Sequence, residues 1–210
     1  KVLFRDATFT LDKERAHAIC DRILEKGFRL TWWAETRVDR LDRPLLEKLR
    51  SAGCVGLNVG VETGDEQVMA GQAKRGLSME KLIRLRNDAK EIGLALHFLM
   101  LVGFPDETRR SLLASYDLIQ DLRPESLGIT LITPYPGTPL HEEAARRGWI
   151  EPGTTWADYG GHQPVMHTDR MTAQDLVHGL EALHRGFGLL RMRGKVDEAA
   201  LQRVLDEDYM

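Results

Sequence analysis

Glu62 is an acidic residue that directly follows a segment predicted to form a β-strand, residues 54–61. In the run Gly56–Val61 before it, the apolar residues fall on one face, while Asn58, Gly60 and Glu62 fall on the other. Small residues around a carboxylate leave room for a ligand, so Glu62 is predicted to accept hydrogen bonds from ligand hydroxyl groups. Two structural roles remain open for Glu62: a cap on the following helix, or an ion pair with a lysine.

Two earlier strand ends also carry carboxylates. Asp6 follows the first strand, and a helix cap or a loop turn explains it as well as a ligand does. Glu35 and Arg37 lie two residues apart near the end of the second strand, and they therefore share one face of an extended chain. They could serve a ligand or form only an ion pair with each other.

A stiff turn, Gly103-Phe104-Pro105, follows the fourth strand. Its flat backbone edge could lie against a planar heterocycle. Glu107 and Thr108 come directly after it, where they can cap the next helix. His97 lies within the fourth strand and is predicted to be a core histidine with a satisfied hydrogen bond.

Short β-rich segments alternate with longer segments of helical period. Asp12 and Asp42 precede two of the helical segments as N-caps, a third helix is predicted to start near Ser78, and a fourth from about Thr108 to Leu122. This alternation predicts parallel strands joined by helices, with ligands at the carboxyl ends of the strands. The five predicted strands cover residues 1–4, 28–34, 54–61, 94–102 and 126–132.

The predicted fold class is α/β, and five strands leave a partial barrel or an open sheet because a full barrel takes about 250 residues. Residues 134–170 are predicted to form a capping or loop region. Residues 171–210 are predicted to be helical, with a long helix from Thr172 and a short helix or fraying tail from residue 196. Because the first strand starts abruptly at Lys1, we expect a fragment that lacks a preceding strand, with an exposed edge that favours oligomers.

Composition excludes several classes of function. The chain has 29 Lys and Arg against 32 Asp and Glu, with no basic run, so nucleic-acid binding is not expected. No apolar run reaches the roughly 20 residues that span a membrane. Cys20 and Cys54 stand alone and are predicted to be buried thiols in a reducing, cytoplasmic setting, and no metal site is predicted from them or from His162 and His167.

Taken in chain order, the strand ends resemble those of radical SAM enzymes, from the second strand of that fold onward. Coverage runs from Lys1 to about Tyr159, and six weak motifs in the right order are specific together. The most similar group carries a cobalamin-binding domain ahead of the radical SAM domain, alongside the methylthiotransferase and Elongator-type branches. The matching pieces are Phe4-x-Asp6-x-x-Phe9-Thr10, Glu35-Thr36-Arg37-x-Asp39, Gly53-Cys54, Gly60-Val61-Glu62-x-Gly64, Gly103-Phe104-Pro105-x-Glu107-Thr108 and Thr133-Pro134-Tyr135-Pro136-Gly137-Thr138.

The resemblance implies a partial (β/α)6 TIM-like barrel of parallel strands with its first strand missing, residues 1–133 as its core, and a helical C-terminal extension. It also implies an enzyme with a [4Fe-4S] cluster and S-adenosylmethionine (SAM). Reductive cleavage of SAM would give a 5′-deoxyadenosyl radical that attacks a small-molecule substrate. Alternatively, SAM would act in methyl transfer with cobalamin held on a separate N-terminal domain.

The same resemblance implies the contacts of SAM. The implied contacts are Asp6 to the amino group, Glu35 and Glu62 to the ribose hydroxyls, Lys74 to the carboxylate, and Gly103, Phe104 and Pro105 to the adenine. Arg75 is the alternative to Lys74 for the SAM carboxylate. Many relatives carry a second acidic residue where this chain has Arg5-Asp6-Ala7, which weakens the assignment of Asp6 to the SAM amino group.

The chain departs from the family pattern because it lacks the Cys-x3-Cys-x2-Cys motif that holds the cluster. The cluster ligands are therefore expected outside this chain, and the chain alone is expected to be inactive. Two other functions stay open. One is a cluster-free binding or scaffold module, and the other is an unrelated partial-barrel hydrolase or aldolase in which Glu62 and Asp6 act as acid and base.

Overall fold

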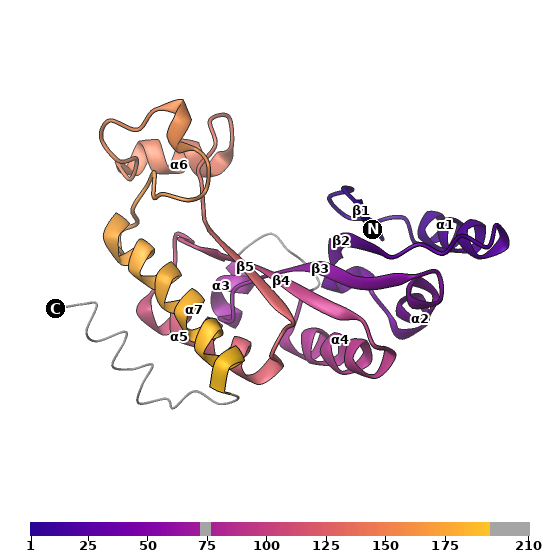
Figure 1. Ribbon diagram of the computed structural model, residues 1–210. Coiled ribbons are helices and arrows are strands. Elements are labelled where there is room, and N and C mark those ends of the chain that lie inside the picture. The colour runs from indigo at the N-terminus through magenta and orange to yellow at the C-terminus, as the bar shows by residue number, and fades with distance from the viewer. Residues whose placement is uncertain (72–76, 194–210) are drawn as a thin grey trace. The chain divides into compact units, whose positions relative to one another are not determined.

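The computed structural model describes residues 1–71 and 77–193, and its strands form one five-stranded sheet in the order β1-β2-β3-β4-β5 (Figure 1). The first three strands pair in parallel, β1 with β2 and β2 with β3. Each strand is followed by at least one helix, so the structure confirms the predicted strand–helix alternation. The strands are β1 (Val2–Phe4), β2 (Trp32–Arg37), β3 (Cys54–Glu62), β4 (Ala95–Val102) and β5 (Ser126–Leu131).

The helices begin where local capping chemistry predicts. Asp12, Asp42 and Ser78 each accept a hydrogen bond from a backbone N–H in the first turn of α1, α2 and α4, which confirms the two predicted N-caps and the predicted helix start near Ser78. Gly93 ends α4 in the left-handed conformation that glycine adopts without cost. The helices are α1 (Lys13–Glu25), α2 (Arg43–Ser51), α3 (Glu66–Gly71), α4 (Met79–Ile92), α5 (Arg109–Leu122), α6 (Pro139–Arg147) and α7 (Ala173–Arg193), with short 3-10 turns η1 (Val38–Arg40) and η2 (Trp156–Asp158).

One predicted strand is placed wrongly at its start. Strand β2 begins at Trp32 rather than at residue 28, and it continues to Arg37. Phe28 donates its backbone N–H to the carbonyl of Ile23 and is 59% exposed, so it still belongs to the end of α1. Because β2 is shifted, Glu35 lies within the strand and not beyond its end.

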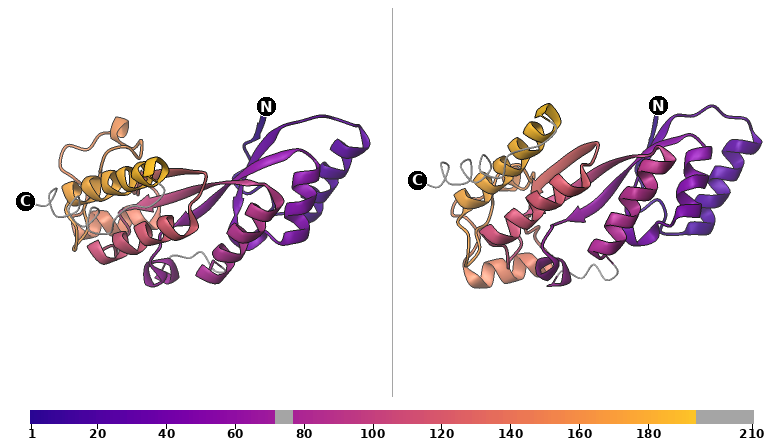
Figure 2. Two further views of the ribbon diagram at one scale, coloured as in Figure 1. Left: turned by 60° about the horizontal axis from the view of Figure 1, so that its bottom comes forward. Right: turned by 90° about the horizontal axis from the view of Figure 1, so that it is seen from below.

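The chain forms two compact units, and strands β3, β4 and β5 pass from one to the other. The first unit consists of Lys1–Val61, Gln72–Leu99 and Leu122–Gly128. In it, α1 packs against α2 and α2 against α4 (Figure 2). Trp32 is fully buried beside these helices and donates its indole N–H to the carbonyl of Ala52 at 2.8 Å.

The second unit consists of Glu62–Gly71, Met100–Asp121 and Ile129–Met210. Helix α7 approaches α5 closely in this unit, since a Cβ on Gly186 would lie only 2.2 Å from a ring carbon of Tyr116. Residues 134–170, predicted as a cap or loop, carry a small core of Ala144, Trp149 and Met166. The predicted helix from Thr172 is confirmed as α7, while the predicted tail from residue 196 lies outside the described residues. The boundaries 1–133, 134–170 and 171–210 stay a prediction.

Strand β1 is one of the two edges of the described sheet, and β5 is the other. Val2 and Leu3 of β1 are 41% and 44% exposed, which confirms the predicted exposed edge but leaves oligomer formation a prediction. Within residues 1–71 and 77–193, no helix is long and apolar enough to cross a membrane.

Candidate functional site

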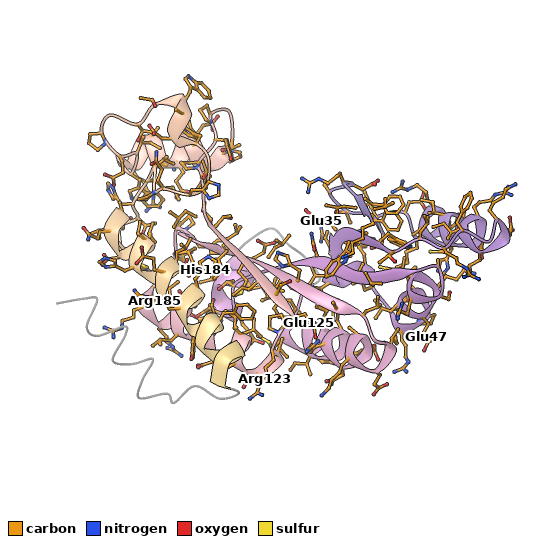
Figure 3. All side chains as sticks on the ribbon, in the orientation of Figure 1. Glu35, Glu47, Arg123, Glu125, His184 and Arg185 are labelled. Carbon is orange, nitrogen blue, oxygen red and sulfur yellow. The ribbon has the colours of Figure 1, made fainter. Side chains whose placement is uncertain are left out.

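Strands β2 and β3 of the first unit present one polar face. Along β2 the buried residues Trp32, Ala34 and Thr36 alternate with half-buried ones, and Glu35 belongs to the half-buried set. The parallel register places Glu35 beside Asn58 of β3, so a carboxylate and an amide lie next to each other on this face. Figure 3 shows Glu35 on its strand. Such a pair can accept and donate hydrogen bonds to the hydroxyls of a ligand.

Arg37, which lies on the same face as Glu35, makes a bidentate ion pair with Asp39. Its Nε and one terminal nitrogen donate to the two carboxylate oxygens at 2.8 and 3.0 Å. Burial favours the neutral form of Asp39, but the Arg37 hydrogen bonds and charge outweigh it and lower the pKa of this carboxyl. The structure therefore gives Arg37 a carboxylate partner in Asp39, and an ion pair between Arg37 and Glu35 stays a prediction.

Asp6 lies after β1, where the sequence predicts a contact to a ligand. In the structure its carboxylate accepts a hydrogen bond of 2.7 Å from the guanidinium of Arg15 in α1. Both side chains are partly exposed, so the pair contributes little to stability. The role of Asp6 at a ligand stays a prediction.

Glu62, the last residue of β3, belongs to the second unit. Its φ of 71° is in the left-handed region, which costs a non-glycine residue roughly 1 kcal/mol or more. The capping role left open for Glu62 belongs to Asp65, whose carboxylate accepts from the backbone N–H groups of Gln67 and Val68 at 2.8 and 3.0 Å. Glu62 is thus held in a strained conformation that helix capping does not require.

The loop after Glu62 is fixed by helix α5. The backbone N–H of Gly64 donates to Oγ of Ser115 at 2.8 Å. A Cβ on Gly64 would lie 2.3 Å from the carbonyl oxygen of Ala114, so only glycine allows this approach. These contacts fix the chain directly after Glu62 and oppose its relaxation to an unstrained conformation.

A buried carboxylate, that of Glu107, fixes the backbone of the turn Gly103-Phe104-Pro105. Glu107 has no exposed surface, and it accepts hydrogen bonds from the backbone N–H of Gly103 at 2.7 Å and from Oγ of Ser111 at 3.0 Å. Burial raises the pKa of Glu107, although these hydrogen bonds partly oppose the shift. The phenyl ring of Phe104 is buried, so the part of this turn that can face a ligand is its backbone and Pro105.

Of the two residues that the sequence offers as caps of α5, Glu107 and Thr108, only Thr108 takes that role. Its Oγ1 accepts from the backbone N–H of Ser111 at 3.2 Å. Glu107 points back toward the turn instead. The available signal was a single acidic residue four positions after Gly103, which does not distinguish the two roles.

Lys74 and Arg75, predicted to bind a carboxylate, lie outside the described residues. His97 has the predicted hydrogen bond, from Nδ1 to Oγ of Ser126 at 2.7 Å, although it is half-buried rather than in the core.

The two cysteines do not fit an iron–sulfur cluster. Cys20 and Cys54 are buried free thiols, as predicted, and burial raises their pKa to about 11 and about 12. A [4Fe-4S] cluster is held by thiolates, and the whole sequence contains only these two cysteines. In the part of the chain that the structure describes, no three His, Cys, Asp or Glu side chains come together as a metal site.

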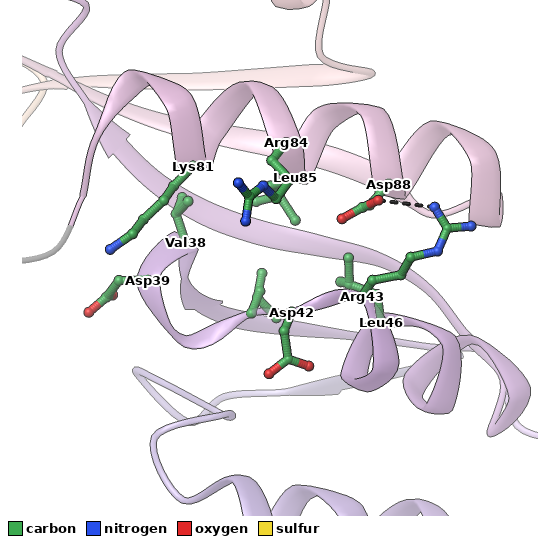
Figure 4. A pocket seen from close by; sticks show the side chains of 10 residues that line it. Val38, Asp39, Asp42, Arg43, Leu46, Lys81, Arg84, Leu85 and Asp88 are labelled. Atoms are coloured by element: carbon green, nitrogen blue, oxygen red, sulfur yellow. Dashed lines mark hydrogen bonds and ion pairs between the residues drawn. The ribbon is translucent and has the colours of Figure 1, made fainter.

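A separate groove lies between η1, α2 and α4 of the first unit. Its volume is about 280 Å³, and its floor is apolar, with Leu46 and Leu85. Arg43 lies at its rim and pairs with Asp88 at 3.1 Å (Figure 4). None of the predicted SAM contacts lines this groove, so it is not the site that the sequence predicted.

The sequence matches a known family of enzymes. The family model of the radical SAM superfamily matches residues 2–119. An uncharacterized methyltransferase of Pyrococcus horikoshii is 30% identical over 90% of this chain and 41% of its own length. The cytidylyl-2-hydroxyethylphosphonate methyltransferase of Streptomyces wedmorensis is 24% identical over 70% of this chain and 29% of its own length.

Solved structures share the fold. The radical SAM methyltransferase TsrM of Kitasatospora setae, solved with cobalamin and a [4Fe-4S] cluster bound, superposes with a TM-score of 0.63 at 24% identity. The superposition covers 83% of this chain and 36% of that chain. The described strands thus form the partial TIM-like barrel of five parallel strands that the sequence predicted. The present chain spans less than half of the relatives it matches, and it belongs to the radical SAM superfamily of enzymes.

Proposed function

We propose that this chain is the SAM-binding core of a radical SAM enzyme that acts on a small-molecule substrate. The proposed contacts are those of the family resemblance: Glu35 and Glu62 to the ribose hydroxyls, Asp6 to the amino group, Lys74 to the carboxylate, and the turn Gly103-Phe104-Pro105 to the adenine. Membership in the superfamily argues against the unrelated hydrolase or aldolase.

The observation that best supports this proposal is the conformation of Glu62. A residue keeps a left-handed backbone only where its surroundings enforce it, and such strain gathers at ligand sites. The Gly64–Ser115 hydrogen bond supplies that enforcement, and the cap on α3 comes from Asp65. A carboxylate so fixed at the end of a strand is preorganised to accept hydrogen bonds from a diol.

Two further residues, Glu35 and Glu107, are suited to orienting SAM. Glu35 lies on the polar face beside Asn58, where its carboxylate can accept from a hydroxyl. Glu107 holds the backbone of Gly103 and Phe104 in place, so the turn can lie flat against the adenine without rearranging. SAM would supply either the 5′-deoxyadenosyl radical or a methyl group.

The cluster and the cobalamin are proposed to lie outside this chain. Two buried thiols cannot supply the three thiolates of a Cys-x3-Cys-x2-Cys motif, so we propose that the chain alone is inactive. The methyltransferases among its relatives favour methyl transfer, and the cobalamin bound in TsrM favours a separate cobalamin-binding domain. Free buried thiols are typical of a reducing compartment, and we propose the cytoplasm.

Anaerobic reconstitution of the natural protein that contains this chain tests the proposal. Iron content and SAM-derived 5′-deoxyadenosine or S-adenosylhomocysteine would be measured after reduction. About four irons per protein with SAM turnover is the expected result. Absence of both iron and SAM binding would instead favour the cluster-free binding or scaffold module.

A further inference from the structure

The polar face of the first unit also carries a histidine that the proposed SAM contacts do not use. His97 lies on the half-buried face of β4, which alternates with the buried residues Leu96 and Phe98. Its Nδ1 lies 2.7 Å from Oγ of Ser126 in the neighbouring strand β5. One ring nitrogen is therefore committed to the protein, which fixes the orientation of the imidazole.

A glycine lets strand β5 lie close to the other ring nitrogen. A Cβ on Gly128 would lie 3.0 Å from Nε2 of His97 and 3.4 Å from a methyl carbon of Leu99. A larger residue at position 128 would require the imidazole to shift by a few tenths of an ångström. Among residues 1–71 and 77–193, Nε2 has no hydrogen-bonding partner, although His97 is half-buried. A polar atom with such surroundings is suited to a ligand.

Charge around this nitrogen favours a hydrogen-bond donor. Burial lowers the pKa of His97, and the nearby carboxylate of Glu35 opposes this only in part, so the imidazole is neutral at neutral pH. Glu35 accepts hydrogen bonds only, and Asn58 beside it adds no charge. The acceptor groups of His97 and Glu35 therefore suit a ligand group that carries a proton.

We propose that His97 is a substrate-binding residue. Nδ1–H donates to Ser126, and Nε2 accepts a hydrogen bond from a hydroxyl, amino or ring N–H group of the small-molecule substrate. This inference rests on the proposed function, because it assigns the substrate to the same polar face as Glu35. It goes beyond that function by naming a residue and a substrate chemistry.

Two substitutions at position 97 separate the two ring nitrogens. In His97→Asn the amide can still reach Ser126, but nothing occupies the position of Nε2. In His97→Gln the amide reaches that position, but the bond to Ser126 is lost. His184→Asn, an exposed histidine on α7 (Figure 3), is the matched control.

The variants are compared in the reconstituted natural protein, with the low-molecular-weight ultrafiltrate of an extract of the source organism as the substrate probe. Stimulation of SAM turnover by this fraction is expected to fall about tenfold in His97→Asn and to persist in His97→Gln and in His184→Asn. The reverse order of the two His97 variants would show that the histidine only links β4 to β5, and would overturn the proposal. Weakened SAM affinity in both variants would place His97 at SAM and would also overturn it.

A spectroscopic measurement tests the tautomer that the proposal requires, without any substrate. Nitrogen NMR of the histidine side chains in the natural protein reports which nitrogen of His97 carries the proton. A proton on Nδ1 is the expected result, and a proton on Nε2 would overturn the proposal. Failure of the wild-type protein to bind or turn over SAM would contradict the proposed function, and it would be recognised separately from either result at His97.

Discussion

The carboxylate of Glu107 accepts a hydrogen bond of 2.7 Å from the backbone N–H of Gly103, and the Glu107 side chain has no exposed surface. A second hydrogen bond from Ser111 ties the same carboxylate to α5. The turn after β4 is thus supported by a buried acid rather than by its own sequence alone. A rigid backbone edge at a strand end binds a flat ligand with little entropic cost.

Removing the Glu107 carboxylate should destabilise the protein. Glu107→Ala leaves the buried N–H of Gly103 without its acceptor, and the expected loss is about 1–3 kcal/mol in the free energy of unfolding. Glu107→Gln keeps one acceptor oxygen and should lose less. Urea unfolding at neutral pH measures both, with Glu47→Ala on the exposed side of α2 as the control. Equal losses for the alanine and glutamine variants would contradict the hydrogen-bond account.

The same residue should make stability depend on pH. Burial raises the pKa of Glu107 above its ordinary value of 4.5, so the folded state disfavours the charged form. Its contribution to stability is therefore complete below the ordinary pKa and is lost as the pH rises through the raised pKa. Relative to Glu107→Gln, the wild-type protein should lose stability over that range. Unfolding measured from about pH 4.5 upward checks this, and a difference that grows with pH in favour of the wild type would refute it.

Gly64 should tolerate no side chain. The nearest atoms to its Cβ position are backbone atoms of Ala114 and Ser115, which cannot move aside without shifting α5. Gly64→Ala is expected to cost about 1–3 kcal/mol and to weaken SAM binding through Glu62. Gly188→Ala on the exposed side of α7 meets nothing within 4 Å and should stabilise by about 0.5–1 kcal/mol. Thermal unfolding of the two variants would show opposite shifts, and a shift of the same sign would count against this reasoning.

The two proposed ribose carboxylates should each contribute to SAM affinity. Glu35→Gln and Glu62→Gln replace a charged acceptor by a neutral one, and each should weaken binding by up to about 1.5–3 kcal/mol. Glu47→Gln, on helix α2 and paired with Arg43, serves as the charge-matched control (Figure 3). Calorimetric titration of the natural protein with SAM measures all three. Unchanged affinity in Glu35→Gln or Glu62→Gln would remove that residue from the site.

Local features of this fold are readable from the sequence. Asp12 and Asp42 cap their helices as predicted, and Ser78 caps the helix predicted to start near it, because an N-cap depends on a side chain and a backbone N–H three residues away. The start of β2 was misplaced by four residues because the hydrogen bond from Phe28 to Ile23 extends the end of α1. A β-rich composition alone does not show at which residue the preceding helix ends and the strand begins.

The sequence by itself determined the strand–helix order, the polar residues at the strand ends and the family, since each depends on residue type and spacing along the chain. Tertiary structure alone decided that Glu107 holds Gly103, that Asp65 rather than Glu62 caps α3, and that Ser126 orients His97. The Glu107 and Asp65 contacts decide between capping roles that residue type had left open. The Ser126–His97 contact joins two neighbouring strands. Side-chain direction and strand neighbours are set by packing, so residue types and spacing alone could not have predicted these roles.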